Sequence, residues 1–337
     1  MLNRKLAPPF QKTLSLSLPQ PVEDKLASGF TLFGIPGIEQ NVVKVEVVFH
    51  AGKWLETKTG LSHFTAALLE KGTSTKTAKE IADTLDHYGA NLEVSPGFDF
   101  VSVALYSLKT NLEHVFPLFL EILQDPFFPE NEWVLLKEIF LQNLKINNEK
   151  TSYRASSLIR KNIFGETHPY GSSIEEPEVQ AIAPTDFQNF FKATFKVHSI
   201  YWVGNLSDSD IAMFQQGFQS LRGSSSLASP WIEPSALPFA QRVKKEGLQS
   251  SIRLGKRGVL KTDPDYFDLL IYNHLLGGFF GSRLMKNIRE EKGFTYGIYS
   301  SLNSFVRDGM FMVGADVNQS NLGLARSEEH TSELHSL

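Results

Sequence analysis

The first clear pattern of apolar and polar positions lies at residues 42–50, where VVKVEVVFH alternates and predicts a half-buried β-strand. Apolar residues then recur at helical spacing over residues 60–69. Thr77 followed by Glu80 is the signature of a capping box and predicts a second helix, which ends at Gly89. The elements expected next are a hairpin of residues 91–94 and 100–105 around a turn at 95–97, helices over 110–123, 129–147 and 153–164, and a strand over 199–205.

The order of elements repeats in the last third of the chain. A helix closed by a glycine, a strand, a turn and a second strand are expected around residues 83–105 and again around 282–317. This repeat predicts an α+β fold made of two copies of one α/β unit, with the second copy incomplete. The elements expected in the second copy are a strand over 250–255, helices over 266–276 and 282–292, the latter closed by Gly293, and strands over 296–302 and 309–317.

A segment rich in serine and proline separates the two copies and has the composition of a linker. The predicted organisation is an N-terminal domain over residues 1–222, a linker over 223–238 and an incomplete C-terminal domain over 239–325.

Composition and charge exclude several classes of protein. The chain has 337 residues, of which 42% are hydrophobic, and a formal net charge of −4 at pH 7. Such a chain can bury a core but has no basic surplus to bind nucleic acid phosphates. It contains 0 cysteines, which excludes disulfides, thiolate metal sites and cysteine nucleophiles. The sequence shows no export signal and no apolar run long enough for a membrane span, so we expect a cytoplasmic protein that does not bind membranes.

His63 is the first candidate for chemistry, in the stretch GLSHFTAALLEKGT. A lone histidine on an apolar helix is most often a satisfied core residue. This stretch, however, is similar to the helix of insulinase/pitrilysin-type peptidases, the inverzincins, in which H-x-x-E-H supplies two zinc-binding histidines and a catalytic glutamate. Here Ala66 stands at the position of that glutamate and Ala67 at that of the second histidine. A hand alignment places Asn143 at the position of the family's third ligand, a glutamate.

The resemblance therefore implies a degenerate zinc site at His63, Ala66, Ala67 and Asn143. A catalytic zinc needs three protein ligands, an open position for water and a general base. One imidazole does not supply these groups. We expect no zinc, no other cofactor and no catalytic residue in this chain alone.

A second candidate follows the glycine-rich turn GGFFGS at residues 277–282. Glycine-rich turns are common, and this one is neither a P-loop nor a dinucleotide-binding fingerprint. The string that follows nevertheless resembles S-R-L-x-x-x-I-R-E-x-x-G-x-x-Y, the signature of the second half of the same family. The resemblance implies that Arg289 and Tyr296, seven residues apart, contact the substrate at the zinc site. Without it, Arg289 would belong to a charged helix face and Tyr296 to a half-buried strand.

Two further segments fit the resemblance less specifically. Residues 91–94 resemble the edge strand on which family members bind an extended peptide by strand addition, although an ordinary hairpin strand is an equally good interpretation. The stretch from Phe164 to Gly171 is similar to the family's F-G-x-x-H-P-Y-G turn, in which we expect His168 to be a turn residue and not a ligand.

The resemblance implies two homologous insulinase-like α/β sandwich domains of the LuxS/processing-peptidase-like type. It also implies a non-zinc-binding subunit of a heteromeric zinc metallopeptidase, inactive alone, whose Arg289 and Tyr296 contact a peptide or unfolded polypeptide. The partner expected is a homologous subunit with an intact H-x-x-E-H that brings the zinc. The alternative is a catalytically inactive structural or peptide-binding subunit of a larger complex.

The last residues, 326–337, read RSEEHTSELHSL, and His330 and His335 among glutamates suggest a metal cluster. A spacing of five puts the two histidines on different faces of a helix, which weakens that interpretation. The string resembles the translation of a sequencing-library adapter. We therefore expect it to be a non-native tail and the natural chain to continue beyond Ala325.

Overall fold

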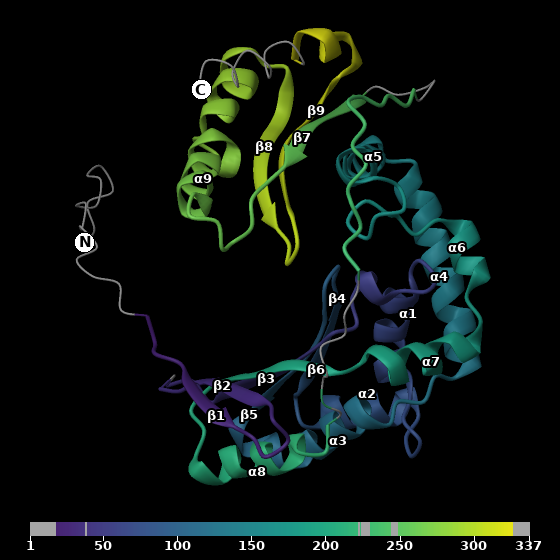
Figure 1. The fold of residues 1–337 in the computed structure, drawn as a ribbon, viewed down its shortest axis with the longest axis vertical. Coiled ribbons are helices and arrows are strands. Elements are labelled where there is room, and N and C mark those ends of the chain that lie inside the picture. The colour runs from purple at the N-terminus through teal and green to yellow at the C-terminus, as the bar shows by residue number, and fades with distance from the viewer. Residues whose placement is uncertain (1–17, 38, 222, 224–229, 244–248, 326–337) are drawn as a thin grey trace, which may run out of the picture.

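The computed structural model describes residues 18–37, 39–221, 223, 230–243 and 249–325. Its strands form two sheets, one of six strands in the first part of the chain and one of three strands in the second (Figure 1). The strands are β1 (Val22–Lys25), β2 (Thr31–Ile35), β3 (Val42–Phe49), β4 (Asn91–Pro96), β5 (Val101–Leu108), β6 (Val197–Val203), β7 (Gln249–Arg257), β8 (Thr295–Ser304) and β9 (Gly309–Asn318).

The six-stranded sheet has the order β1-β2-β6-β3-β5-β4. Within it β2 and β6 pair in parallel, and every other neighbouring pair is antiparallel. The alternating sequence of β3 explains its place in the sheet, because Val43, Val45, Val47 and Phe49 are buried on one face and the residues between them are less buried. The strand predicted at residues 42–50 and the hairpin of β4 and β5 are confirmed, although β4 extends to Pro96.

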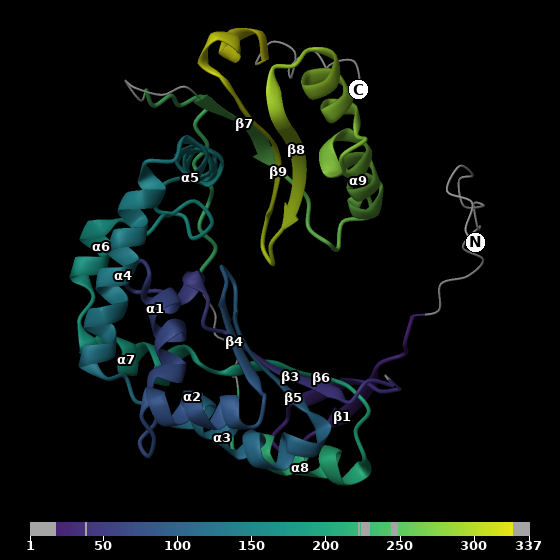
Figure 2. The ribbon, with the colours of Figure 1, turned by 180° about the vertical axis from the view of Figure 1, so that it is seen from behind.

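Helices cover one face of this sheet, and α2, α3 and α8 lie on the side away from the second sheet (Figures 1 and 2). The capping box predicted for α2 is present, with Thr77 N donating to the Glu80 carboxylate at 2.8 Å. None of the helices in the described part of the chain is long and apolar enough to cross a membrane. The α-helices are α1 (Leu61–Leu68), α2 (Ala78–His87), α3 (Leu112–Gln124), α4 (Glu130–Asn148), α5 (Thr151–Phe164), α6 (Glu176–Ala181), α7 (Pro184–Thr194), α8 (Asp208–Phe218) and α9 (Tyr266–Asn273), and the 3-10 segments are η1 (Lys53–Leu55), η2 (Leu69–Lys71), η3 (Lys109–Asn111) and η6 (Gln319–Asn321).

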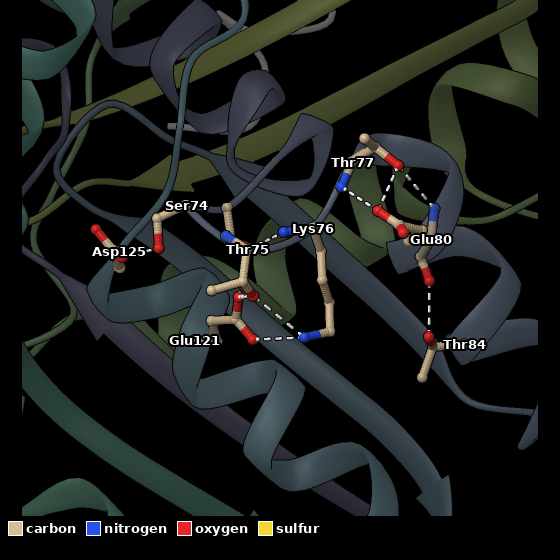
Figure 3. Close-up of polar contacts among 9 residues, drawn as sticks. Ser74, Thr75, Lys76, Thr77, Glu80, Thr84, Glu121 and Asp125 are labelled. Atoms are coloured by element: carbon tan, nitrogen blue, oxygen red, sulfur yellow. Dashed lines mark hydrogen bonds and ion pairs between the residues drawn. The ribbon is translucent and has the colours of Figure 1, made fainter.

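The loop between α1 and α2 is held on α3 by a polar network (Figure 3). The Glu121 carboxylate accepts hydrogen bonds from the hydroxyls of Thr73 and Thr75 and, at 3.1 Å, from the ammonium of Lys76. Burial alone would raise the pKa of Glu121, but these bonds lower it below its ordinary value. The network fixes the end of α1 and the start of α2 relative to α3.

The three-stranded sheet has the order β7-β9-β8 and is antiparallel throughout. Packed against β8 are α9 and two π-helical segments, η4 (His274–Gly278) and η5 (Met285–Glu291). The three strands expected here are confirmed. Two helix predictions need correction: the helix expected over 266–276 ends its α-helical part at Asn273 and continues as η4, and the helix expected over 282–292 is the π-helix η5.

The wider turns of η5 show in its hydrogen bonds, because Lys292 N donates to Asn287 O, five residues back, at 3.1 Å. The segment closes at Gly293 as predicted. Gly293 has a φ of +65°, a left-handed conformation that glycine adopts without strain, and Phe294 N then donates back to Ile288 O at 3.0 Å.

The internal repeat is visible in the order of elements, since α1-α2-β4-β5 in the first unit corresponds to α9-η5-β8-β9 in the second. The two copies differ in how their first helix is covered. α1 buries Leu61, Phe64 and Leu68 against its neighbours, whereas α9 contains no buried residue and exposes Phe267 and Ile271.

The two sheets lie at opposite ends of a curved molecule, with α5 between them (Figures 1 and 2). β7 packs along α5, where Ser251 Oγ lies 2.9 Å from Thr151 Oγ1. The described part of the predicted linker also follows α5, because Leu237 N donates to Asn162 O at 2.7 Å. The domain boundaries themselves stay predictions.

A second contact between the units is made by the turn between β8 and β9. The ring of Phe305 in this turn stacks on Tyr170 of the first unit, with ring centroids 4.4 Å apart. The Tyr170 hydroxyl donates to Asp99 Oδ1 at 2.6 Å, and Val306 N donates to Asp99 Oδ2 at 3.2 Å. Burial and the bond to Asp99 raise the pKa of the fully buried Tyr170. The buried phenol and the carboxylate therefore join the two units.

Candidate functional site

The helix α1 carries His63, and a buried carboxylate starts this helix. Gly60, with a φ of +95°, precedes the first turn. The Glu56 carboxylate accepts hydrogen bonds from Gly60 N at 3.1 Å and Ser62 N at 2.9 Å, two of the N–H groups that a helix N-terminus leaves unpaired. Burial raises the pKa of Glu56, against the opposing effects of the Lys53 charge and these two bonds.

His63 is half-buried between aromatic rings. Its ring centroid lies 5.1 Å from that of Phe64 and 5.5 Å from that of Phe140 on α4. Burial and the positive charge of Lys53 lower the pKa of His63, so the imidazole is neutral at pH 7. In the folded chain His63 therefore packs against aromatic rings, and its place in a degenerate zinc site stays a prediction.

The other positions of the degenerate zinc site hold no donor that could complete a metal site with His63. Ala66 is fully buried, Ala67 has only a methyl group, and Asn143 is exposed on α4. On α4, the phenyl ring of Phe140 contacts His63. In the described part of the chain no three side chains of the metal-binding types come together. The residues at this place do not fit a catalytic zinc, which needs three ligands and a base.

The second candidate pair is Arg289 and Tyr296. Arg289 lies near the end of η5 and Tyr296 near the start of β8, the next element of the second unit. Arg289 belongs to η5, and its guanidinium lies 4.5 Å from the ring centroid of Phe280 in the glycine-rich turn. This cation–π contact keeps the charge at the surface next to an exposed ring. π-helical turns occur often at functional sites because they displace side chains from regular helical positions.

A β-bulge directs Tyr296 into solvent. The register of β8 with β9 shifts between Thr295, opposite Val317, and Ile298, opposite Ala315. Thr295 Oγ1 accepts a hydrogen bond from Gly297 N at 3.1 Å, which holds the bulge. The Tyr296 side chain is 90% exposed, the highest value among the exposed large hydrophobic residues of the described chain. The phenol is therefore free to contact another molecule.

The glycine-rich turn has a packing role. A Cβ atom on Gly277 would lie 2.4 Å from Ser300 N of β8, so only glycine permits this approach of η4 to the strand. Ser300 Oγ in turn donates to Asn273 O at 3.1 Å. The turn fixes η4 against β8, and Phe280 of the same turn lies under the Arg289 guanidinium.

The expected peptide-binding segment, residues 91–94, lies in an edge strand. β4 pairs with β5 on one side and with no further strand of the described chain on the other. An edge strand presents backbone N–H and C=O groups that can pair with an added strand. The geometry needed for strand addition is therefore present.

His168 is a turn residue, as predicted. It is buried, its Nδ1 accepts a hydrogen bond from Tyr170 N at 3.1 Å, and its carbonyl accepts one from Gly171 N at 2.9 Å. The predicted non-native tail, residues 326–337, lies outside the described residues.

The structure also brings together two cations that sequence reasoning missed. Lys53 of η1, which lies near His63, and Arg160 of α5, which lies near Lys53, are both partly buried, and burial lowers the pKa of each. No motif connects two residues so far apart in the chain. The one local signal is Lys53 directly before the apolar pair Trp54-Leu55.

Comparison with known proteins gives two family matches. Residues 38–178 match the family described as insulinase (peptidase family M16), and residues 199–330 match the family described as peptidase M16 inactive domain. The chain is 29% identical over 276 residues to a Bacillus subtilis (strain 168) protein named uncharacterized zinc protease YmxG, covering 77% of this chain and 64% of the relative. It is 25% identical over 268 residues to a Helicobacter pylori (strain ATCC 700392 / 26695) protein named non-peptidase homolog YmxG, covering 77% of this chain and 62% of the relative. The chain thus spans less than two thirds of either relative.

One similar solved structure is that of a peptidase M16 inactive domain from Pseudomonas fluorescens. It superimposes with a TM-score of 0.83 at 27% identity, covering 91% of this chain and 78% of the other. The arrangement of two α+β units is therefore shared with a protein of that description.

Proposed function

Because this chain belongs to the insulinase family of metallopeptidases, peptidase family M16, we propose that it is the non-zinc-binding subunit of a heteromeric zinc peptidase. In this proposal the chain is catalytically inactive alone and binds a peptide or unfolded polypeptide. Its partner is a homologous subunit with an intact H-x-x-E-H, which supplies the zinc and the activated water. The similarity to an inactive-domain structure and to a non-peptidase homolog supports the inactive part of this proposal.

One observation carries the proposal: the chain lacks the donors of a zinc site but presents Tyr296 on a bulge, 90% exposed. A tyrosine with only a packing role would not be held in solvent. The phenol can donate a hydrogen bond to the oxygen of a peptide carbonyl as negative charge develops there. Arg289 adds a planar fork of donors suited to the same or a neighbouring carbonyl.

The free edge of β4 supplies the second part of the proposed function. A peptide added to this edge would pair through backbone groups, which gives affinity with little dependence on sequence. The exposed side chains of β4 include Asn91, Glu93 and Ser95, so the strand offers a polar face beside the bound peptide. Such binding fits substrates that are unfolded or short.

The test is reconstitution with a zinc-bearing homologous subunit from the same genome. Tyr296→Phe removes one donor and keeps the ring, and losses of one oxyanion donor typically reduce kcat by about 10²–10³-fold. Arg289→Lys keeps the charge but loses the fork, so turnover falls there too, partly through KM. Complex formation is checked by size-exclusion chromatography, and turnover is followed with a quenched fluorescent peptide.

Two exposed residues of the same unit provide matched controls. Tyr299→Phe changes another tyrosine of β8, and Arg283→Lys changes another exposed arginine before η5. Both controls should keep turnover within about twofold of the unsubstituted complex. If Tyr296→Phe and Arg289→Lys also keep it, the pair is structural, and the chain is better described as an inactive structural or peptide-binding subunit. Zinc analysis of the isolated chain should find far less than one ion per molecule.

A further inference from the structure

Two positive side chains, those of Lys53 and Arg160, lie partly buried near each other, and the carboxylate of Glu56 close to Lys53 offsets only part of their charge. In the part of the chain that the structure describes, neither Lys53 nor Arg160 makes an ion pair. Buried charges in folded proteins are normally paired, and an unpaired one points to a ligand or to a functional role.

Lys53 is held in place by neutral groups. Its Nζ donates to the carbonyl oxygen of Ser172 at 3.2 Å and lies 3.5 Å from Ser172 Oγ. The same ammonium lies 5.4 Å from the ring centroid of Phe98. Burial lowers the pKa of Lys53, the negative charge of Glu56 acts against this, and the positive charge of Arg160 lowers the pKa further, so the two cations affect each other.

Arg160 comes from the neighbouring face of α5. Its Nε is fully buried and has no hydrogen-bond acceptor among the described residues. Ser157, one turn earlier on the same face of α5, has its Oγ 2.6 Å from Ser173 Oγ. Ser173 follows Ser172, the residue that holds Lys53, so the segment at 172–173 contacts both Lys53 and the helix that carries Arg160.

The carboxylate of Glu56 attracts Lys53, but a single negative charge does not balance two cations. Both oxygens of Glu56 are used by the first turn of α1, and burial raises the pKa of this carboxyl. The neighbouring imidazole of His63 is neutral, because burial and the charge of Lys53 lower its pKa. The phenol of Tyr153 lies near Arg160 on α5. The place therefore has a surplus of positive charge and an unused donor.

We propose that Lys53 and Arg160 form a binding site for a carboxylate group of a peptide, beside the degenerate zinc site. This inference rests on the proposed function, because it names the chemistry of the bound peptide. A carboxylate matches the fork of a guanidinium with two parallel hydrogen bonds and would supply the acceptor that Arg160 Nε lacks. Lys53 adds a point charge from the other side. The carboxylate is either the C-terminus of the peptide or the side chain of an aspartate or glutamate.

The experiment uses three fluorescein-labelled nonapeptides of alanine, leucine and serine. The first has a free C-terminal carboxylate, the second a C-terminal amide, and the third the amide with one serine replaced by glutamate. Fluorescence polarisation with the purified chain should show that the amide binds at least about tenfold more weakly than the free carboxylate, since charge-assisted bonds are lost. If glutamate restores binding, the site takes acidic side chains as well as C-termini; if it does not, the site takes C-termini alone.

Substitutions test which side chains bind the carboxylate of the peptide. Arg160→Gln and Lys53→Gln should each reduce the affinity for the free carboxylate to that of the amide and leave the amide unchanged. Arg154→Gln, an exposed arginine on the same helix, is the matched control and should change neither. The melting temperature of Arg160→Gln should stay within a few degrees of wild type, because the substitution removes a buried charge without a partner.

Each contrary result has a distinct meaning. Equal binding of the carboxylate and amide peptides by the wild-type chain would overturn the carboxylate site and leave the proposed function intact. Failure of all three peptides to bind would overturn peptide binding itself and with it this site. A large fall in the melting temperature of Arg160→Gln would also overturn the site, because it would show that the guanidinium is a structural group.

Discussion

Removal of one buried hydroxyl, in Tyr170→Phe, should weaken the contact between the two units. Tyr170 is fully buried, and its hydroxyl donates to Asp99 Oδ1 at 2.6 Å. The substitution keeps the ring and its stacking on Phe305, so the change is confined to the bonds of the hydroxyl, this one and the bond that it accepts from Arg307 N at 3.3 Å. A hydrogen bond to a charged group contributes about 1.5–3 kcal/mol, and we expect the free energy of unfolding to fall by about that amount.

The magnitude belongs to the upper part of this range only if Asp99 has no easy replacement for the lost donor. Its other oxygen already accepts from Val306 N at 3.2 Å, but Asp99 is only half-buried, so water can partly replace the lost donor and the fall should lie in the lower part of the range. A double-mutant cycle with Asp99→Asn measures the coupling directly, which should be at least about 1 kcal/mol.

The assay is urea unfolding followed by tryptophan fluorescence, which reports on the junction because the rings of Trp54 and Tyr170 are 5.4 Å apart. Tyr106→Phe is the matched control, since that hydroxyl donates to Glu93 at 3.1 Å on the exposed surface and should contribute less than about 0.5 kcal/mol. A Tyr170→Phe variant no less stable than the control would refute the conclusion that this bond holds the units together.

Two further predictions concern the framework of each unit. In the folded state the pKa of Glu121 is below its ordinary value. The Glu121 carboxylate therefore stabilises the fold at any pH above its ordinary pKa, and this stabilisation is lost as the pH falls through the lower pKa of the folded state. The difference in urea midpoint between wild type and Glu121→Gln should be clear at pH 7 and disappear in acid. Gly277→Ala should destabilise the second unit by about 1–3 kcal/mol, because the new Cβ would lie 2.4 Å from Ser300 N. Gly297→Ala, where a Cβ meets no atom within 4 Å, is the control, and an equal melting temperature of the two variants would contradict the packing role of Gly277.

Local signals in the sequence were sufficient for most elements of the fold. The alternation in β3, the capping box at Thr77 and the glycine closure at Gly293 each depend on neighbouring residues, and all three are confirmed. The parallel pairing of β2 with β6 joins residues far apart in the chain and has no local signal. The hydrogen bonds of the π-helix η5 span one residue more than those of an α-helix. The spacing of apolar residues in the sequence does not reveal this difference.

The candidate site was predictable where residue type alone decides the chemistry. Ala66 and Ala67 cannot bind a metal in any conformation, so the sequence predicts the loss of the zinc site without any knowledge of the fold. The contact of Phe140 with His63 and the exposure of Tyr296 depend on helix packing and on a β-bulge, which only the structure shows. Lys53 and Arg160 are brought together by the fold without any shared motif.

The uncovered face of α9 also determines how the chain behaves in concentrated solution. Phe267, Ile271 and Leu275 present large apolar side chains to water along successive turns, with Phe280 exposed nearby. The free energy falls when such surfaces leave water together, so molecules of this chain tend to associate at high concentration. We therefore expect colloidal stability to depend on this helix as well as on the net charge of −4.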